Sequence, residues 1–131
     1  MKNIICILAI VLMTSTVFGQ NETEMKEFDS NFSHTVFFWL KNPDNTADRA
    51  AFETSLKKFL GKSEYAKTKF IGTPPKASRD VVDGSFTYSL ILSFDSAESQ
   101  QAYQDEVPHK VFIEESSDLW SKVIVYDSTG I

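Results

Sequence analysis

The chain is organised around residues 84–109, which read GSFTYSLILSFDSAESQQAYQDEVPH. Over residues 86–94, large apolar or aromatic side chains alternate with mostly small polar ones, and this period of two predicts a half-buried strand. Asp95 stands three residues before Glu98, a capping-box spacing that predicts the start of a helix. Because Pro108 interrupts helical structure, the stretch predicts a strand followed by a broken helix.

The N-terminal segment, residues 1–19, has the pattern of an export signal. Lys2 supplies a short positive region, an apolar run covers residues 4–13, and residues 17–19 offer small side chains for cleavage before Gln20. The apolar run is short for a membrane span, and the alternative is an uncleaved anchor. We expect a signal peptide over 1–19, a periplasmic or secreted protein, and no association with a membrane after cleavage.

Charge and cysteine content narrow the function classes. The 131-residue chain carries 18 Asp and Glu against 13 Lys and Arg, for a net charge of −5, and it has no basic cluster. This balance argues against binding nucleic acid or an anionic membrane surface. The single cysteine, Cys6, lies in the predicted signal, so the exported part is expected to lack disulfides, thiol catalysis and zinc–thiolate sites.

Periodicity and turn signals predict the remaining elements. The expected set is a strand over 34–41, a helix over 46–60, a strand over 65–72, a surface loop over 73–83, the strand over 86–94, the broken helix through 117, and a strand over 119–127. The β-α-β-β-α-β order predicts an α+β, ferredoxin-like domain over 34–127, with one antiparallel sheet and helices on one face. Residues 20–33 are expected to form a flexible N-terminal arm and 128–131 a C-terminal tail.

The sheet face turned away from the helices is expected to be apolar. The chain has 11 Phe, and the strand over 34–41 has apolar residues on both faces. The residues assigned to the outer face by alternation include Phe37, Trp39, Ile91, Trp120, Ile124 and Tyr126. Several large side chains exposed together amount to an association surface, so we predict a homodimer packed sheet to sheet.

Four segments together resemble the stress-responsive A/B barrel domain (Dabb). They are residues 34–41, reading HTVFFWLK; residues 94–98, reading FDSAE; Tyr103 with residues 108–112, reading PHKVF; and residues 123–127, reading VIVYD. The resemblance covers the chain from about Ser33 to Asp127. It implies a dimeric α/β barrel, built from two ferredoxin-like subunits whose sheets meet.

One branch of that family, similar to olivetolic acid cyclase, closes a linear polyketide by aldol condensation with a pocket histidine and tyrosine. Carried over by position, this histidine falls on His109, the tyrosine on Tyr103 and a further pocket histidine on His34. The chain departs from the branch at Tyr88, where the cyclases have histidine, and at Glu106-Val107, where they have His-Pro.

The residues themselves leave two interpretations for each candidate. His109 can act as a base beside a Tyr103 hydroxyl that holds a carbonyl or enolate oxygen, or it can bond a backbone carbonyl and cap its helix. His34 can bind a ligand or be satisfied at the sheet edge, and Tyr88 can line the pocket or fill it. His34 and His109 lack the short helical spacing of metal ligands, so no metal site is predicted.

Two functions follow. The first is an exported binding domain that holds a small hydrophobic ligand in a pocket between sheet and helices. The alternative is a cyclase, isomerase or monooxygenase acting on a carbonyl compound, with His109 as base and Tyr103 as oxyanion donor. The sequence has no glycine-rich phosphate loop and no Gly-x-Ser-x-Gly motif, and we expect no cofactor.

Overall fold

The computed structural model describes Phe28 and residues 31–131, so the predicted signal peptide and most of the predicted N-terminal arm lie outside the described residues. The elements are β1 (Phe32–Leu40), α1 (Thr46–Leu60), β2 (Thr68–Gly72), β3 (Tyr88–Phe94), α2 (Ala97–Asp105), α3 (Val107–Ser116), the short 3₁₀ helix η1 (Ser117–Leu119) and β4 (Trp120–Thr129). β1 begins two residues before the predicted start of the domain, and β4 ends two residues after the predicted end.

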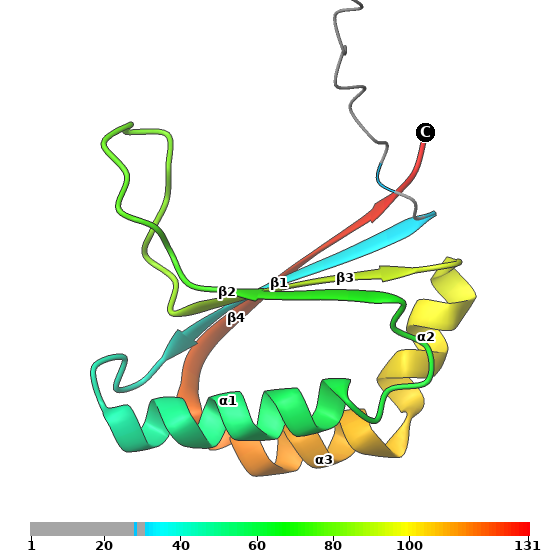
Figure 1. Cartoon of the computed structure of the whole chain (residues 1–131), viewed down its shortest axis with the longest axis horizontal. Coiled ribbons are helices and arrows are strands. Elements are labelled where there is room, and N and C mark those ends of the chain that lie inside the picture. The colour runs from blue at the N-terminus through cyan, green and yellow to red at the C-terminus, as the bar shows by residue number, and fades with distance from the viewer. Residues whose placement is uncertain (1–27, 29–30) are drawn as a thin grey trace, which may run out of the picture.

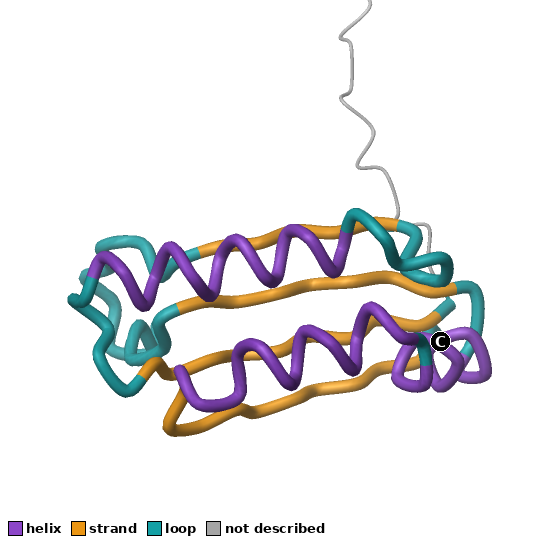
Figure 2. Tube along the Cα trace, turned by 90° about the horizontal axis from the view of Figure 1, so that it is seen from below, coloured by secondary structure: helices purple, strands orange, loops and turns teal. Residues whose placement is uncertain are grey.

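The four strands form one antiparallel sheet in the order β2-β3-β1-β4. All the helices lie against one face of this sheet, and the opposite face is left uncovered by them (Figures 1 and 2). This arrangement confirms the predicted ferredoxin-like fold. Within the described part of the chain, no helix is long and apolar enough to cross a membrane.

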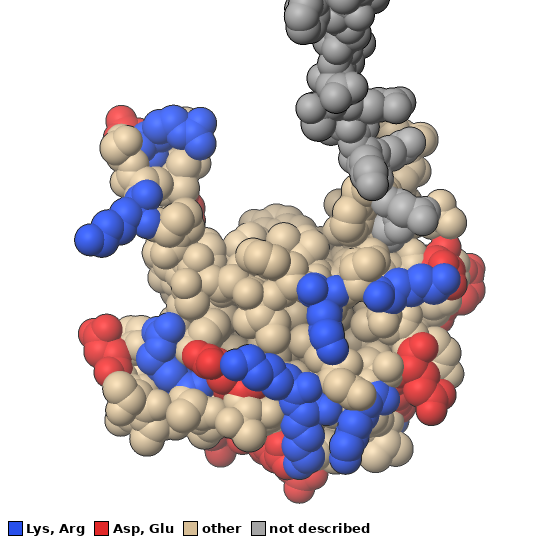
Figure 3. All heavy atoms as spheres, viewed as in Figure 1, with Lys and Arg blue, Asp and Glu red and all other residues tan. Residues whose placement is uncertain are grey.

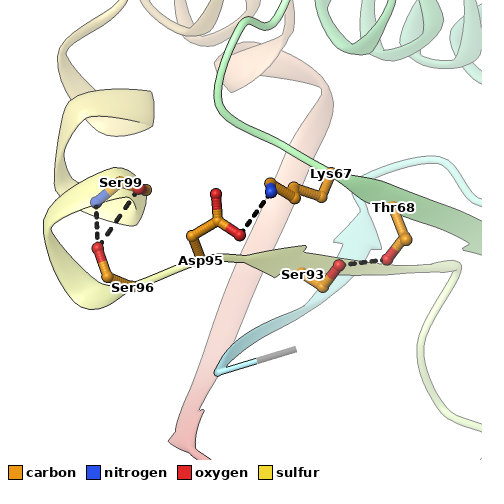
Figure 4. A network of polar contacts seen from close by, with 6 residues as sticks. All are labelled: Lys67, Thr68, Ser93, Asp95, Ser96 and Ser99. Atoms are coloured by element: carbon orange, nitrogen blue, oxygen red, sulfur yellow. Dashed lines mark hydrogen bonds and ion pairs between the residues drawn. The ribbon is translucent and has the colours of Figure 1, made fainter. Parts of the chain in front are cut away.

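Capping residues set where the helices begin. The side chain of Asn45 accepts hydrogen bonds from the backbone N–H groups of Ala47 and Asp48 and starts α1, as expected of a turn residue before a helix. The predicted cap of α2 is wrong by one residue, because Ser96 rather than Asp95 accepts a bond from the N–H of Ser99 (Figure 4).

The Asp95 carboxylate is engaged elsewhere. It pairs with the ammonium group of Lys67, next to a hydrogen bond between the Thr68 and Ser93 hydroxyls that joins β2 to β3 (Figure 4). Such a contact between residues far apart in the sequence competes with local capping, and it explains the one-residue error.

The core lies between the sheet and the helices. Its centre is Phe52 of α1, which is 0% exposed and stacks on Tyr88 with ring centroids 4.9 Å apart. Phe38 packs edge-on against the Phe52 ring with centroids 5.0 Å apart, and Phe112 of α3 packs edge-on against it at 5.9 Å. This aromatic cluster joins α1 and α3 to the central strands, and it fixes the position of α3 over β1.

Trp120 belongs to this core, so its assignment to the outer face is wrong. Its ring centroid lies 5.4 Å from that of Phe38 and 5.7 Å from that of Phe112, on the helix side. The β1–β4 register shifts where Trp39 pairs with Lys122 but Leu40 pairs with Trp120. A bulge of this kind adds a residue to one strand and reverses the alternation beyond it.

The outer face is apolar in its middle, as predicted. Phe37 packs edge-on against Phe86 at 4.9 Å and against Tyr126 at 6.2 Å. The Lys122 ammonium group sits 4.3 Å above the ring of Trp39. Tyr126 is 60% exposed, so large aromatic surface faces solvent on this side of the single chain.

Candidate functional site

A cavity of about 170 Å³ lies between the sheet and the α2–α3 pair. Three ring side chains that can exchange protons, His34, Tyr103 and His109, contribute to its wall together with Gln104. The rest of the wall is apolar: Val36, Phe38, Leu90, Phe112, Ile113, Trp120, Val123 and Val125. Few polar groups in an otherwise apolar hollow are typical of a small-molecule site.

β1 carries His34 on its helix-facing side, where only 4% of the residue is exposed. In the β1–β4 register His34 stands opposite Asp127, and its Nδ1 lies 2.6 Å from the carboxylate oxygen Oδ1. In this geometry Nδ1–H donates to that carboxylate, and Nε2 remains as the ring nitrogen for a second hydrogen bond. His34 is therefore satisfied by Asp127 and also lines the cavity.

Tyr103 of α2 lies between the two histidines. Its ring centroid is 5.7 Å from that of His34 and 5.1 Å from that of His109, and 1% of the residue is exposed. None of the hydrogen bonds among the described residues involves its hydroxyl. Burial raises the pKa of Tyr103, and the negative charges of Glu106 and Asp127 raise it further, so the phenol remains a hydrogen-bond donor.

His109 lies in the first turn of α3, just after Pro108. Its Nδ1 is 3.2 Å from the backbone carbonyl oxygen of Gln104, an arrangement in which Nδ1–H donates. Burial lowers the pKa of His109, partly offset by that bond and by the charge of Glu106. The ring is therefore neutral at pH 7 and has an Nε2 lone pair available to accept a proton.

Tyr88 is not brought together with these three residues. It pairs with Phe38, two inward-facing positions along β1 from His34, and it is not in the cavity wall. Its hydroxyl donates to Glu53 Oε1 at 2.7 Å, and the Arg49 guanidinium lies 4.8 Å above its ring. Burial and this carboxylate raise the pKa of Tyr88 to about 12, consistent with a phenol that supports α1 on the sheet.

The Stress Responsive A/B Barrel Domain model matches residues 32–129, which include every element described above. The chain belongs to the stress-responsive A/B barrel family. The match confirms the resemblance of the four sequence segments to that family. No curated protein matches the chain.

Solved structures support the fold of this A/B barrel domain. A dimeric ferredoxin-like protein of unknown function from Thermobifida fusca is 15% identical, covering 82% of this chain and 98% of that chain, with a TM-score of 0.62. A Dabb family protein from Mesorhizobium loti is 18% identical, covering 76% and 96%, with a TM-score of 0.64. A hydroxynitrile lyase from Passiflora edulis is 19% identical, covering 76% and 93%, with a TM-score of 0.65.

Sequence reasoning missed one carboxylate near the cavity of this A/B barrel domain, Asp127, and placed the other, Glu106, only at a departure from the cyclase branch. Asp127 shares strand alternation with the inward-facing Val123 and Val125, so an acidic residue on an inward face was the available signal. Glu106 accepts a bond from the backbone N–H of Glu64 through Oε2, while its buried Oε1 has no partner among the described residues. Both charges act on Tyr103.

Chemically, the arrangement supplies a proton acceptor and a proton donor on the same apolar wall. His109 Nε2 can accept a proton, and the Tyr103 hydroxyl can donate a hydrogen bond to an oxygen atom. The described residues include no group of three or more potential metal ligands.

Proposed function

We propose that this A/B barrel protein binds a small, mostly apolar carbonyl compound in the cavity lined by His34, Tyr103 and His109. The observation that carries the proposal is the meeting of two imidazoles and one phenol in an apolar cavity of about 170 Å³. A volume near 150 Å³ accommodates a benzene-sized molecule, so the ligand should have roughly six to ten heavy atoms. The Tyr103 hydroxyl makes no hydrogen bond among the described residues, which supports a role as donor to the carbonyl oxygen.

A second candidate is a cofactor-free enzyme acting on such a compound, either a cyclase or isomerase that works by proton transfer, or a monooxygenase that removes a proton before the substrate reacts with O₂. The state of His109 favours it: the ring is neutral, and the Gln104 carbonyl holds Nδ1, which leaves Nε2 as the base. Tyr103 would stabilise the negative charge that develops on the carbonyl oxygen. The Passiflora edulis protein is a hydroxynitrile lyase, so this fold houses at least one enzyme.

Binding and turnover are separated by one experiment. The purified protein is screened by NMR against small ketones and aldehydes, with hydrocarbons of the same shape as controls. If the NMR signals of cavity residues shift with the carbonyl compounds but not with the hydrocarbons, the proposed binding is supported. If the hydrocarbons shift these signals equally, the polar side chains of the cavity do not select the ligand and the proposal is contradicted. Deuterium exchange at the carbon beside the carbonyl, followed in D₂O, then detects proton transfer. The enzyme hypothesis is refuted if the rate of deuterium exchange is the same with and without the protein. It is also refuted if the His109→Ala variant exchanges deuterium as fast as the wild-type protein.

We also propose that the protein is a homodimer whose outer sheet faces pack together. Phe37, Trp39 and Tyr126 supply the apolar surface, and burying each large aromatic side chain contributes about 2 kcal/mol. The related protein from Thermobifida fusca is dimeric, which supports this proposal. Sedimentation analysis over a range of concentrations tests it, and a monomer at every concentration would refute it.

Export is proposed from residues 1–19 of the sequence. A mature N-terminus at Gln20, recovered from the periplasm or the culture medium, is the expected result. An intact N-terminus on protein recovered from the cytoplasm would overturn this proposal without affecting the cavity or the dimer.

A further inference from the structure

The connection between β2 and β3, residues 73–87, projects from the sheet. Figure 1 shows that it rises on the face away from the helices, and Figure 3 shows it standing apart from the body of the molecule. Phe37 and Trp39, which belong to the proposed dimer face, lie on this same side. We call residues 73–87 the projecting loop.

The base of the projecting loop is attached to the outer face. The ring of Phe86 packs edge-on against Phe37 at 4.9 Å, and the Trp39 indole N–H donates to Ser85 Oγ at 3.1 Å. The two limbs also touch, because a Cβ atom on Gly84 would lie 3.5 Å from Cβ of Pro74. These contacts, together with the restricted backbone of the Pro74-Pro75 pair, limit the movement of the loop relative to the sheet.

The outer part of the projecting loop has apolar surface that the single chain does not use. Val81 is 85% exposed, next to a turn in which the Val82 N–H donates to the carbonyl oxygen of Arg79. Long connections without secondary structure are uncommon in compact domains and usually have a function. An anchored loop with an exposed valine is suited to contact another protein.

The charges of the loop decide against an anionic target. Lys76 and Arg79 are balanced by Asp80 and Asp83, so the loop is neutral overall. Nucleic acid and anionic membranes are bound through an excess of positive charge, which the loop lacks. Contact with a protein surface fits its chemistry better.

The length of the projecting loop indicates that the protein it contacts is the second copy of this chain. Each limb has about seven residues, which can extend roughly 20 Å at about 3.3 Å per residue. Two sheets packed face to face lie only about 10 Å apart. A copy seated on the outer face therefore lies beside the loop, which is long enough for its tip to reach the sheet of that copy.

We propose that the projecting loop clasps the second subunit of the homodimer, with Val81 in contact with the partner. This proposal rests on the sheet-to-sheet dimer of the proposed function. It adds a contact outside the sheet face, so the outer part of the loop, residues 75–83, contributes to dimer affinity, while its base packs on the sheet of its own chain.

The main test shortens the loop. Because the limbs touch at Pro74 and Gly84, residues 75–83 can be replaced by Asn-Gly, the preferred pair for a tight two-residue turn. We expect the dimer dissociation constant, measured by sedimentation equilibrium, to rise at least tenfold, while far-UV circular dichroism stays unchanged. A folded variant with the wild-type dissociation constant would overturn the clasp.

A point variant tests the contact without remodelling the backbone. Val81→Asp places a charge at the tip and should raise the dissociation constant at least threefold. The matched control is Val107→Asp, at an exposed valine (71%) on α3 in the helix layer, which should leave the constant unchanged. Equal effects of the two variants would contradict the clasp.

The failure of the clasp and the failure of the dimer give different results. If the wild-type protein is monomeric at every concentration, the sheet-to-sheet dimer is wrong and the clasp falls with it. If the wild-type protein is dimeric and the shortened variant dimerises equally well, the dimer stands and only the clasp is refuted.

Discussion

Two tyrosines with different surroundings provide a matched pair of single-atom perturbations. Tyr103→Phe removes a hydroxyl from the cavity wall, and Tyr88→Phe removes one that donates to Glu53 Oε1 at 2.7 Å. Each change deletes an oxygen and keeps the ring in the core. The structure predicts opposite consequences for stability and for ligand affinity.

For Tyr88→Phe, the lost bond has a charged acceptor, and such bonds contribute about 1.5–3 kcal/mol. The Glu53 side chain is 37% exposed, so water replaces part of the interaction. We therefore expect the free energy of unfolding to fall by about 1 kcal/mol, which lowers the melting midpoint by about 4–8 °C in a domain of this size. Ligand affinity should not change, because Tyr88 is outside the cavity wall.

For Tyr103→Phe, no hydrogen bond among the described residues is lost. Removing this hydroxyl should therefore change the free energy of unfolding by less than about 0.5 kcal/mol. A carbonyl ligand that accepts a bond from this hydroxyl should lose about 1–1.5 kcal/mol of binding free energy, or about 5–13-fold in affinity.

Urea unfolding measures the stability of both variants, and NMR titration with a carbonyl ligand found in the screen measures affinity. The reasoning is refuted if Tyr103→Phe loses 1 kcal/mol or more of stability while its affinity is unchanged. It is also refuted if Tyr88→Phe weakens binding as much as Tyr103→Phe does, because Tyr88 would then belong to the site.

Three other predictions address the core and the protonation of the cavity. Phe52→Ala should lower the free energy of unfolding in urea by about 3–5 kcal/mol, because the ring is fully buried at the centre of the aromatic cluster; a loss below 1 kcal/mol would contradict that role. Burial lowers the pKa of His109 in the folded state, so the unfolded chain binds more protons and stability should fall as the pH drops below about 6.5. His109→Gln should lessen this loss in urea unfolding between pH 6.5 and 5, and an unchanged pH dependence would disprove the assignment. Glu106→Gln removes a charge that raises the His109 pKa, so that pKa, followed by NMR titration, should fall further; a rise would show that the carboxylate acts otherwise.

Local patterns in the sequence predicted the elements because each depends on neighbouring residues. Alternation placed His34 on the helix-facing side of β1, and Asn45 in the turn before α1 supplied its cap. The same rules failed where a distant residue intervened. Lys67 engages the Asp95 carboxylate, and the cap of α2 moves to Ser96.

Register explains the largest error. Trp120 was assigned to the wrong face because the β1–β4 bulge is a property of two paired strands and has no signature in either one alone. For Tyr88 the sequence left open whether the ring lines the pocket or fills it, and in the structure Tyr88 lies opposite Phe38, outside the cavity wall. The face toward which a side chain points follows from local alternation along its strand. The residue that lies opposite it depends on how two strands pair, and neighbouring residues do not determine this.

The sequence by itself determined the β-α-β-β-α-β order and the apolar outer face, since periodicity and turn signals are readable along one chain, and the family resemblance singled out His109 and Tyr103 as candidates. Only the tertiary structure decided that Asp127 holds His34, that Tyr88 supports α1, and that the loop over 73–87 rises over the outer face. These features depend on strand register and on contacts between residues many positions apart. Such contacts form, and stabilise the protein, only once the sheet and helices have packed.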